Sequence, residues 1–414
     1  MRNDPPKSAV SQDSVDHFYM AEALRLARKG RFTSQPNPRV GCVLVKNGQL
    51  IGRGWHRKAG QAHAEVNAIR QAGDQANGAC AYVTLEPCSH FGKTPPCADA
   101  LIKAGVSRVV VAIQDPNPDV SGSGIAKLRA AGIEVCINVL SEQARQINRG
   151  FIKRMETGTP WLTIKMAMSV DGRTAMSSGE SKWITGAAAR ADVQRLRAES
   201  SAVITGIGTL LADDAALTVR AEQIEVASLS SDVTEKMDSS FDGISLEELV
   251  SVQPLRVVLD SQARMPLNAR LLETKTPVLW VISDEQKLDS AQQLVADLDF
   301  VDILRVPNLL SADGMNLILK HLAKLACNEV LLEAGSTLAG SILAADLWDE
   351  FVLYVAPKLM GCSAKPLFTL PIDSMNKAKA LKLHDLRLVG DDVRYIYRPA
   401  GETSCLETTA SGAP

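Results

Sequence analysis

The chain has 414 residues, of which 46% are hydrophobic, and its 45 Lys and Arg against 47 Asp and Glu give a formal net charge of −2. This length predicts two or three domains with their own cores at roughly 150 residues each, which excludes a small disulfide-stapled scaffold. The balanced charge gives no basic field for duplex nucleic acid, and no apolar run reaches the roughly 18 residues of a membrane span. Eight cysteines are an ordinary number for a chain of this length, and the residues before the first predicted helix do not have the pattern of a signal peptide. We therefore expect a cytoplasmic protein that binds neither nucleic acid nor membrane.

The first part of the chain predicts alternating helices and strands. Apolar residues recur at spacings of three and four from Ser14 until Gly30, which is typical of an amphipathic helix. Two β-rich runs, 40–45 and 48–56, meet at a turn-like Lys-Asn-Gly and predict a hairpin. The alternation of helices and strands predicts an α/β layer with parallel pairing. The further elements expected here are a helix over 64–72, a strand over 81–85, a helix near 98–104, a strand over 108–113 and a helix–strand pair ending near Val139.

A segment with Gly and Pro, residues 151–161, marks the expected domain boundary, and the α/β pattern restarts after it. Strands are predicted at 161–169, 202–206, 255–260, 277–283 and 329–335, with helices over 187–200 and from about Leu338. Residues 221–250 contain eight acidic residues, one Lys and six Ser, the composition of a solvated or disordered insertion. The predicted organisation is a flexible N-terminus (1–13), a first α/β domain (14–155), a second α/β domain (156–400) with a surface insertion at 221–250, and a flexible tail (401–414).

The sharpest functional signal is His63-Ala64-Glu65 followed by Pro87-Cys88 and then Cys97. One imidazole and two thiolates suit a tetrahedral Zn²⁺ whose fourth position is left to water, which is the arrangement of a catalytic site. Glu65 would lie near the metal without binding it, and could move a proton from a metal-bound water to a ring nitrogen and the leaving amine. The pattern follows the general zinc-deaminase signature H-x-E…P-C-x-x-C. It predicts hydrolytic deamination of a nucleobase-like ring.

The spacing of the two cysteines departs from that signature. Eight residues separate Cys88 from Cys97 where the signature has two, so the helix-start geometry of a tight C-x-x-C is not expected. The plain alternative is that these are unrelated core and surface residues. An ordered H-x-E, P-C and C set within 35 residues rarely arises by chance, which weakens that alternative.

Longer motifs carry a resemblance. In the first half they are PNPRVGCVLV, HAEVNAI, TLEPCSHFGKTPPC and QDPNP, and in the second half KMAMSVDGRTA, SGESKWIT, RLRAES, GTLLADD, LTVR and LLEAGSTLAG. With these motifs the sequence resembles the bifunctional riboflavin biosynthesis deaminase/reductase family, in which the eight-residue gap between the cysteines is the usual variant. The resemblance covers nearly the whole chain except the first dozen residues, the insertion and the tail. It implies a cytidine-deaminase-like α/β/α domain followed by a dihydrofolate-reductase-like α/β domain.

The resemblance also implies two successive reactions on a small phosphoribosylated pyrimidine. The first is the zinc-dependent deamination of 2,5-diamino-6-ribosylamino-4(3H)-pyrimidinone 5′-phosphate. The second is the NADPH-dependent reduction of the ribosyl group of 5-amino-6-(5-phosphoribosylamino)uracil to ribityl. One Zn²⁺ per chain would be held by His63, Cys88 and Cys97, with Glu65 as the catalytic proton shuttle. NADPH rather than NADH rests on the resemblance alone, and the oligomeric state is left open, a homo-oligomer included.

Further site residues follow from the same resemblance. Deaminase substrate contacts fall on Asn37, His56, His90, Lys93, Asp115 and Asn117. Reductase substrate contacts fall on Lys165, Ser181, Arg197, Leu217, Arg220 and Glu333. Cofactor contacts fall on Ala167, Trp183, Thr185, Thr209, Asp213, Ser261, Gly335, Ser336, Thr337, Leu338, Ala339 and Gly340.

Side-chain chemistry supports part of this assignment. Asn37 can donate and accept hydrogen bonds toward sugar or base, although an Asn flanked by prolines is as often a turn former. His90 and Lys93 suit a dianionic phosphate, and the guanidinium forks of Arg197 and Arg220 match phosphate oxygens. These patterns predict phosphate recognition in both halves.

The second half lacks a dinucleotide fingerprint. Gly206-Ile207-Gly208 has no third glycine, so a Rossmann domain is not supported. The pattern around Glu333 is a buried strand, then a turn of small residues, then a helix. The N-terminus of that helix could bind cofactor phosphates. From the sequence alone, a simple strand-to-helix turn is an equal alternative.

Three alternative functions stay open. A zinc deaminase could act on another base, such as a free nucleoside or a tRNA adenosine, but the reductase-like half argues against it. A binding module with structural zinc would need a fourth protein ligand, for which Cys80 is the nearest thiol. In the third alternative only one half is active.

Overall fold

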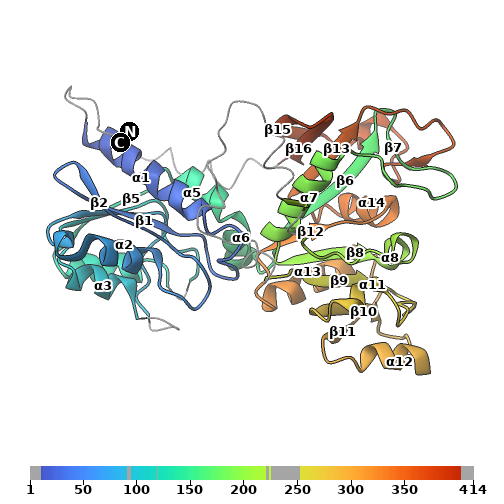
Figure 1. The fold of residues 1–414 in the computed structure, drawn as a ribbon, viewed down its shortest axis with the longest axis horizontal. Coiled ribbons are helices and arrows are strands. Elements are labelled where there is room, and N and C mark those ends of the chain that lie inside the picture. Colours follow the sequence, from blue (N-terminus) through green and yellow to red (C-terminus); the bar gives the residue numbers. More distant parts are fainter. Residues whose placement is uncertain (1–10, 91–94, 119, 221–222, 225–251, 402–414) are drawn as a thin grey trace. The chain divides into compact units, whose positions relative to one another are not determined.

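A computed structural model of the chain describes residues 11–90, 95–118, 120–220, 223–224 and 252–401. Most of the predicted acidic insertion, Lys93, the N-terminal ten residues and the tail from 402 lie outside the described residues. The chain divides into two compact units between Gly158 and Thr159 (Figure 1).

The first unit is built on a five-stranded sheet. Its strands lie in the order β2 (Gln49–Trp55), β1 (Gly41–Lys46), β3 (Cys80–Val83), β4 (Arg108–Val111) and β5 (Glu134–Ile137). β1 is antiparallel to both β2 and β3, whereas β3, β4 and β5 are parallel. The predicted hairpin and the predicted parallel layer are both confirmed.

Helices cover both faces of this sheet, because β1 is apolar on both sides. Val43 and Val45 pack with Met20, whereas Cys42 and Leu44 pack with Ala68. One face carries α1 (Gln12–Arg28), α5 (Ser141–Ile147) and α6 (Arg149–Thr157), and the other carries α2 (Ala64–Ala72), α3 (Cys97–Lys103) and α4 (Ser123–Ala130), with the short η1 (Gly73–Ala76) after α2. The result is an α/β/α sandwich in which the ends of β3 and β4 lead into the segments that carry the predicted deaminase residues.

The segment expected to link the domains is helical in the structure. α6 runs through most of residues 151–161, and its Ile152 is buried in the same cluster as Ile147 of α5. Gly158 then ends α6 with a φ of 71°, a left-handed conformation that favours glycine. The charged composition of this segment reflects one exposed helix face, since its apolar positions belong to the core of the first unit.

The second unit contains a nine-stranded sheet. The strand order is β11 (Val301–Val306), β10 (Val278–Ser283), β9 (Leu255–Leu259), β8 (Ala202–Gly206), β12 (Glu329–Leu332), β6 (Trp161–Ser169), β13 (Glu350–Ala356), β16 (Asp392–Pro399) and β15 (Leu381–Val389). The strands from β11 to β13 are parallel, and β16 and β15 extend the sheet in antiparallel fashion. A separate pair joins β7 (Arg173–Ala175) to β14 (Lys365–Pro366).

Two apolar layers flank the sheet of the second unit. Ile204 and Val257 face the layer of α13 (Ala312–Lys324) and α14 (Ser336–Ala344). Val203 and Val258 face the opposite layer. That layer contains α7 (Ala187–Glu199), α8 (Ile207–Asp213), α11 (Arg270–Glu273) and α12 (Ser290–Ala296), and a short η2 (Met375–Lys377) precedes β15. The five predicted strands of this half are confirmed, whereas β11, β13, β15, β16 and α13 are additional elements.

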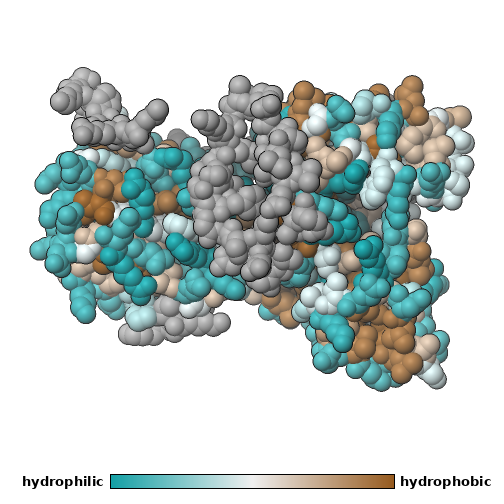
Figure 2. All heavy atoms as spheres, viewed as in Figure 1, coloured by the Kyte–Doolittle hydropathy of each residue, from teal (hydrophilic) through white to brown (hydrophobic). Residues whose placement is uncertain are grey.

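On the face that Figure 2 shows, both units carry hydrophilic side chains with apolar patches between them. None of the helices in the described part of the chain has the length and apolar character that a membrane crossing requires.

Candidate functional site

Three potential metal ligands meet at one end of the sheet in the first unit. His63 is the N-cap residue of α2, Cys88 follows the end of β3, and Cys97 is the first residue of α3. Nδ1 of His63 lies 3.2 Å from Sγ of Cys97 and 3.5 Å from Sγ of Cys88, and the three ligand atoms all lie within 4.8 Å of one another. A tetrahedral zinc ion, with Zn–N of about 2.1 Å and Zn–S of about 2.3 Å, separates such ligands by roughly 3.6 Å. The donor set and its spacing therefore fit zinc.

The structure corrects one expectation about the cysteines. Although eight residues separate them, Cys97 still begins a helix, and its backbone N–H donates to Sγ of Cys88 at 3.3 Å. The N–H of Ala98 also donates to the carbonyl of Cys88. The helix start at Cys97 therefore lies beside Cys88, as in the tight motif, despite the longer spacing in the sequence.

The electrostatics of the cluster favour a thiolate. A hydrogen bond with Cys97, followed by one with His63, lowers the pKa of Cys88 despite the opposing effect of burial. A thiolate is the form in which cysteine binds a metal ion.

Glu65 lies in the first turn of α2 and is 3% exposed. Burial, with a further contribution from the charge of Cys88, raises the pKa of its carboxyl group to about 7. Among the described residues Oε2 has no hydrogen-bond partner. A buried carboxyl with a free oxygen and a pKa near neutrality is suited to take up and release a proton.

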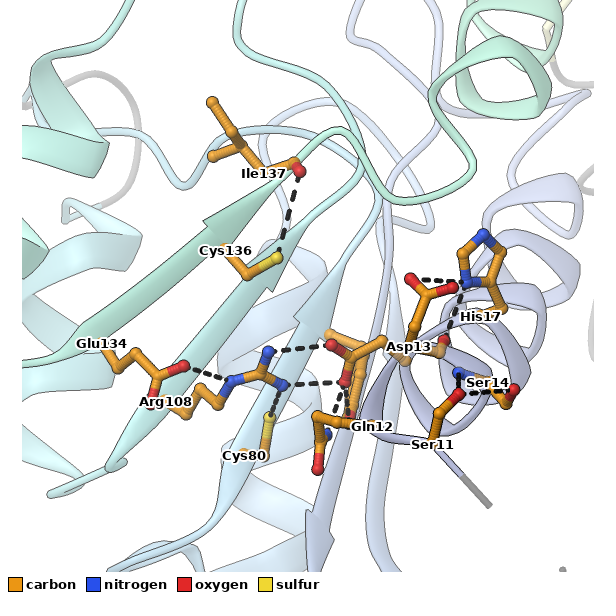
Figure 3. Close-up of polar contacts among 12 residues, drawn as sticks. Ser11, Gln12, Asp13, Ser14, His17, Cys80, Arg108, Glu134, Cys136 and Ile137 are labelled. Carbon is orange, nitrogen blue, oxygen red and sulfur yellow. Dashed lines mark hydrogen bonds and ion pairs between the residues drawn. The ribbon is translucent and has the colours of Figure 1, made fainter.

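Cys80 is not placed to close the metal site. Its Sγ lies 3.8 Å from Nη1 of Arg108, in the cluster that Figure 3 shows. In the part of the chain that the structure describes, the group of potential ligands contains three residues and excludes Cys80. A structural zinc with four protein ligands is therefore not supported.

Two predicted substrate contacts lie beside the metal ligands. Nδ2 of Asn37 is 3.1 Å from Nε2 of His56, and the rings of His56 and His63 meet edge to face with centroids 5.2 Å apart. Burial, followed by the charge of His63, lowers the pKa of His56. His56 is therefore a neutral imidazole near pH 7 that can orient the amide of Asn37.

Three further predicted contacts belong to the neighbouring loops. Asp115 accepts a hydrogen bond from the backbone N–H of Asn117 at 2.9 Å. Burial raises the pKa of Asp115, and the charges of His90 and Cys88 also act on it, so these groups are close. Lys93 lies outside the described residues.

The sequence analysis did not single out Glu86, a buried carboxylate between β3 and Cys88. Its only signal in the sequence is its position directly before Pro87-Cys88, just after a predicted strand.

In the second unit, three predicted substrate residues form one charged cluster. Nε and Nη2 of Arg197 donate to Oε1 and Oε2 of Glu333 at 2.5 and 3.1 Å, and the two side chains are 11% and 12% exposed. The pKa of Lys165 is lowered by burial, raised by the charge of Glu333 and lowered by the charge of Arg197. These effects place Lys165 close to both groups. Burial alone would raise the pKa of Glu333, but Arg197, through its charge and its hydrogen bonds, lowers it overall, with a smaller contribution from Lys165.

This pairing differs from the expected role of Arg197 as a phosphate clamp. Its fork is taken by Glu333, and its Nη1 donates to the carbonyl of Thr218 at 3.1 Å. Arg197 therefore orients Glu333 in this structure. The charge of Arg220 also lowers the pKa of Glu333, which puts Arg220 in the same neighbourhood. Leu217 is 2% exposed and packs in an apolar cluster, so its side chain contributes to the core.

The predicted cofactor residues gather in part around two helix starts. α8 and α14 follow the adjacent strands β8 and β12, with Gly206 and Gly335 as N-cap residues. A Cβ on Gly335 would lie 3.9 Å from Oγ1 of Thr209, which is in α8. α14 begins at Ser336, two residues before its predicted start. The backbone N–H groups at this helix start suit a phosphate.

The remaining predicted reductase residues are more dispersed. Oγ of Ser181 lies 3.4 Å from Oδ1 of Asp213. Trp183 is 61% exposed, with the guanidinium of Arg190 above its ring at 4.3 Å, and the carbonyl of Thr185 accepts a hydrogen bond from the same arginine. Ala167 lies on β6, and Ser261 follows β9.

Comparison with known proteins agrees with both units. The family description "Cytidine and deoxycytidylate deaminase zinc-binding region" matches residues 13–113, and "RibD C-terminal domain" matches residues 160–395. The riboflavin biosynthesis protein RibD of Haemophilus influenzae is 46% identical over 391 residues, which cover 94% of this chain and 98% of that protein. The chain belongs to the RibD family. The RibD of Escherichia coli is 45% identical over 379 residues, covering 91% of this chain and 98% of its own length.

Solved RibD structures extend this similarity to the fold. One form of Acinetobacter baumannii RibD matches with a TM-score of 0.82 and 46% identity, covering 94% of this chain and all of that one. The Thermotoga maritima diaminohydroxyphosphoribosylaminopyrimidine deaminase/5-amino-6-(5-phosphoribosylamino)uracil reductase matches with a TM-score of 0.77 and 30% identity over the same coverage. As a RibD family member, the chain is a bifunctional deaminase and reductase of riboflavin biosynthesis, with a cytidine-deaminase domain and a dihydrofolate-reductase-like domain. A deaminase of another base, without a reductase half, is thereby set aside.

Proposed function

We propose that the first unit deaminates 2,5-diamino-6-ribosylamino-4(3H)-pyrimidinone 5′-phosphate, and that the second reduces the ribosyl group of 5-amino-6-(5-phosphoribosylamino)uracil to ribityl with NADPH. The observation that carries the first half is the three-ligand cluster of His63, Cys88 and Cys97 with a buried Glu65 beside it. The name of the Thermotoga maritima relative supports both substrates. The proposal includes a cytoplasmic location and no nucleic-acid or membrane partner.

In the deaminase step, His63, Cys88 and Cys97 would hold zinc, and Glu65 would move protons. Zinc in such an open site would supply a water molecule with a lowered pKa. With its own pKa near 7, Glu65 can accept a proton at one stage and donate it to a ring nitrogen and the departing amine at another. Asn37 is oriented by His56 and would bind the ring or sugar through its amide.

Phosphate recognition in the first unit would use His90 and Lys93, and the loop with Asp115 and Asn117 would bind the rest of the substrate. A cationic or neutral imidazole and an ammonium group both donate to phosphate oxygens. Asp115 and Asn117 offer acceptors and an amide to ribose hydroxyls.

For the reductase step, NADPH supplies the hydride when bound. The N-terminus of α14 and Thr209 would hold its phosphates, and Trp183 offers an exposed aromatic face. Glu333, held by Arg197, would accept hydrogen bonds from the ribosyl chain, with Lys165 as a neighbouring donor. The lowered pKa of Lys165 makes it a candidate for the proton that the opened sugar requires.

The test separates the two steps. Purified zinc-loaded protein is incubated with the diaminopyrimidinone phosphate alone, with NADPH and with NADH, and ammonia release and nicotinamide absorbance are followed independently. We expect ammonia without any nicotinamide, and loss of NADPH absorbance only after deamination. Absence of ammonia release from the zinc-loaded protein would contradict the first assignment, and equal rates with NADH would contradict the cofactor preference.

A further inference from the structure

Glu86 has an unusual set of partners for a buried carboxylate. It is 3% exposed, and its carboxylate accepts hydrogen bonds from backbone amides of a different segment of the chain. Oε1 accepts from the N–H groups of Gly124 and Ile125 at 2.9 and 3.1 Å. Oε2 accepts from those of Asp115 and Gly122 at 3.1 and 2.9 Å. One side chain thus satisfies four backbone donors.

Two of these bonds cap the start of α4. The N-cap residue of α4 is Gly122, which has no side chain to accept from the first turn. Glu86 replaces that missing cap from a neighbouring segment and places a negative charge at the positive end of the helix. The helix start also touches the segment of Glu86 directly, because a Cβ on Gly124 would lie 1.9 Å from the carbonyl oxygen of Pro87.

The bond to Asp115 fixes the other end of the same loop. Asp115 in turn accepts from the N–H of Asn117, and the carbonyl of Asn117 accepts from the N–H groups of Val120 and Ser121. The loop between β4 and α4 is therefore joined at both ends to a side chain two residues before the metal ligand Cys88. A shift of Glu86 would move the loop relative to the metal site.

We propose that Glu86 is a positioning residue for the deaminase substrate, which sets the loop of Asp115 and Asn117 at a fixed distance from the metal ligands. This inference rests on the proposed function, in which that loop contacts the substrate. Glu86 itself is buried under the loop and its acceptors are occupied by backbone amides, so it acts on binding through the loop and does not touch the reacting atoms.

The main variant is Glu86→Gln, which has the same shape and turns one acceptor oxygen into a donor. Two backbone N–H groups then lose their partner, and the loop loosens while the metal ligands stay in place. We expect zinc to remain stoichiometric, the Michaelis constant for the diaminopyrimidinone phosphate to rise about tenfold, and kcat to fall less than about threefold. Glu86→Asp keeps the charge but draws the oxygens back, and should raise the Michaelis constant less, which provides a second variant if the glutamine form does not fold.

Asp16→Asn is the matched control. Asp16 is 4% exposed in the same unit and accepts hydrogen bonds from Arg108 and Tyr82, on the face of the sheet opposite α4. This variant should lower thermal stability without changing the Michaelis constant. Reduction of separately prepared deaminated substrate gives a control for the second unit.

Several outcomes decide the proposal. A Michaelis constant of Glu86→Gln no higher than that of Asp16→Asn would overturn it, as would loss of zinc from both Glu86 variants at saturating metal. Asn117→Ala tests the underlying contact by itself. An unchanged Michaelis constant there would contradict the substrate role of Asn117, while the comparison of Glu86→Gln with Asp16→Asn still decides whether Glu86 positions the loop.

Discussion

Replacing Glu333 by glutamine removes the charge that joins Arg197 and Lys165 in the reductase unit, with almost no change in shape. In the native protein both oxygens of Glu333 accept from the guanidinium of Arg197, and both side chains are nearly nine-tenths buried. The variant leaves a guanidinium and an ammonium close together without their carboxylate. We expect the reductase unit to lose stability and substrate affinity, and the deaminase unit to remain unchanged.

The size of the stability loss follows from burial. Removing one partner of a buried ion pair costs roughly 3–5 kcal/mol. The lower end applies here, about 3 kcal/mol, because burial already lowers the pKa of Lys165 and this group can release its proton. For a unit of this size, each kcal/mol lowers the melting temperature by roughly 2–4 °C, so its melting temperature should fall by roughly 6–12 °C.

The same variant predicts a pH dependence. The pKa of Glu333 is lowered in the folded protein, so its charge stabilises the fold above the pKa of the unfolded chain, about 4.3. This contribution is lost as the pH falls from that value through the lower folded pKa. The difference in melting temperature between the native protein and Glu333→Gln should therefore shrink in acid.

A double-mutant cycle with Arg197→Met measures the pair directly. Scanning calorimetry of the native protein, both single variants and the double variant should give a coupling energy of about 3 kcal/mol. The exposed pair of Asp346 and Lys379 in the same unit is the control, for which less than about 1 kcal/mol is expected. Reduction assays should show a Michaelis constant at least about tenfold higher for the deaminated substrate, with ammonia release and NADPH affinity nearly unchanged.

A coupling energy no larger than that of the exposed pair would show that the buried position of Arg197 and Glu333 does not strengthen their interaction. The substrate role of Glu333 would be contradicted if Glu333→Gln weakened NADPH binding as much as substrate binding, or if this variant abolished deamination while the protein stayed folded.

Three further predictions concern the first unit. Glu65→Gln should abolish ammonia release and keep zinc, since the carboxylate moves protons and three other residues bind the metal; metal analysis that finds no zinc would contradict this role. Cys88→Ser should lose zinc and deamination together while reduction continues, and stoichiometric zinc in that variant would exclude Cys88 as a ligand. A fragment of residues 1–158 should fold and deaminate alone, because the complete α/β/α sandwich lies within it; an insoluble or inactive zinc-loaded fragment would show that the first unit depends on the second. Ending the fragment at Gly158 preserves the last turn of α6, which a cut at Met155 would remove.

The elements around the metal site were predictable because their signals are local. The helix over 64–72 and the hairpin of β1 and β2 follow from apolar spacing and turn residues within a few positions. The ligand set was predictable for the same reason, since His63 and Glu65 are two residues apart and Pro87-Cys88 lies within five residues of the end of β3. The resemblance in long motifs extended this prediction to both reactions.

Other features depend on contacts between distant segments. The ion pair of Arg197 with Glu333 joins residues 136 positions apart, and no local pattern indicates that this arginine meets a carboxylate. The additional strand β16 pairs with β13, and β15 pairs with β16. The spacing of residues in the sequence does not indicate these pairings. The four amides that meet Glu86 come from residues 29 to 39 positions later.

Residue type and short-range spacing therefore suffice to predict the α/β class, the two halves and the set of zinc ligands, because they specify helix faces, strands and metal donors. The helix start at Cys97, the pairing of Arg197 with Glu333 and the contacts of Glu86 with the loop become visible only in the folded chain. Each of these contacts joins segments that are distant in the sequence, so the partner of a buried charged group depends on how the whole chain packs.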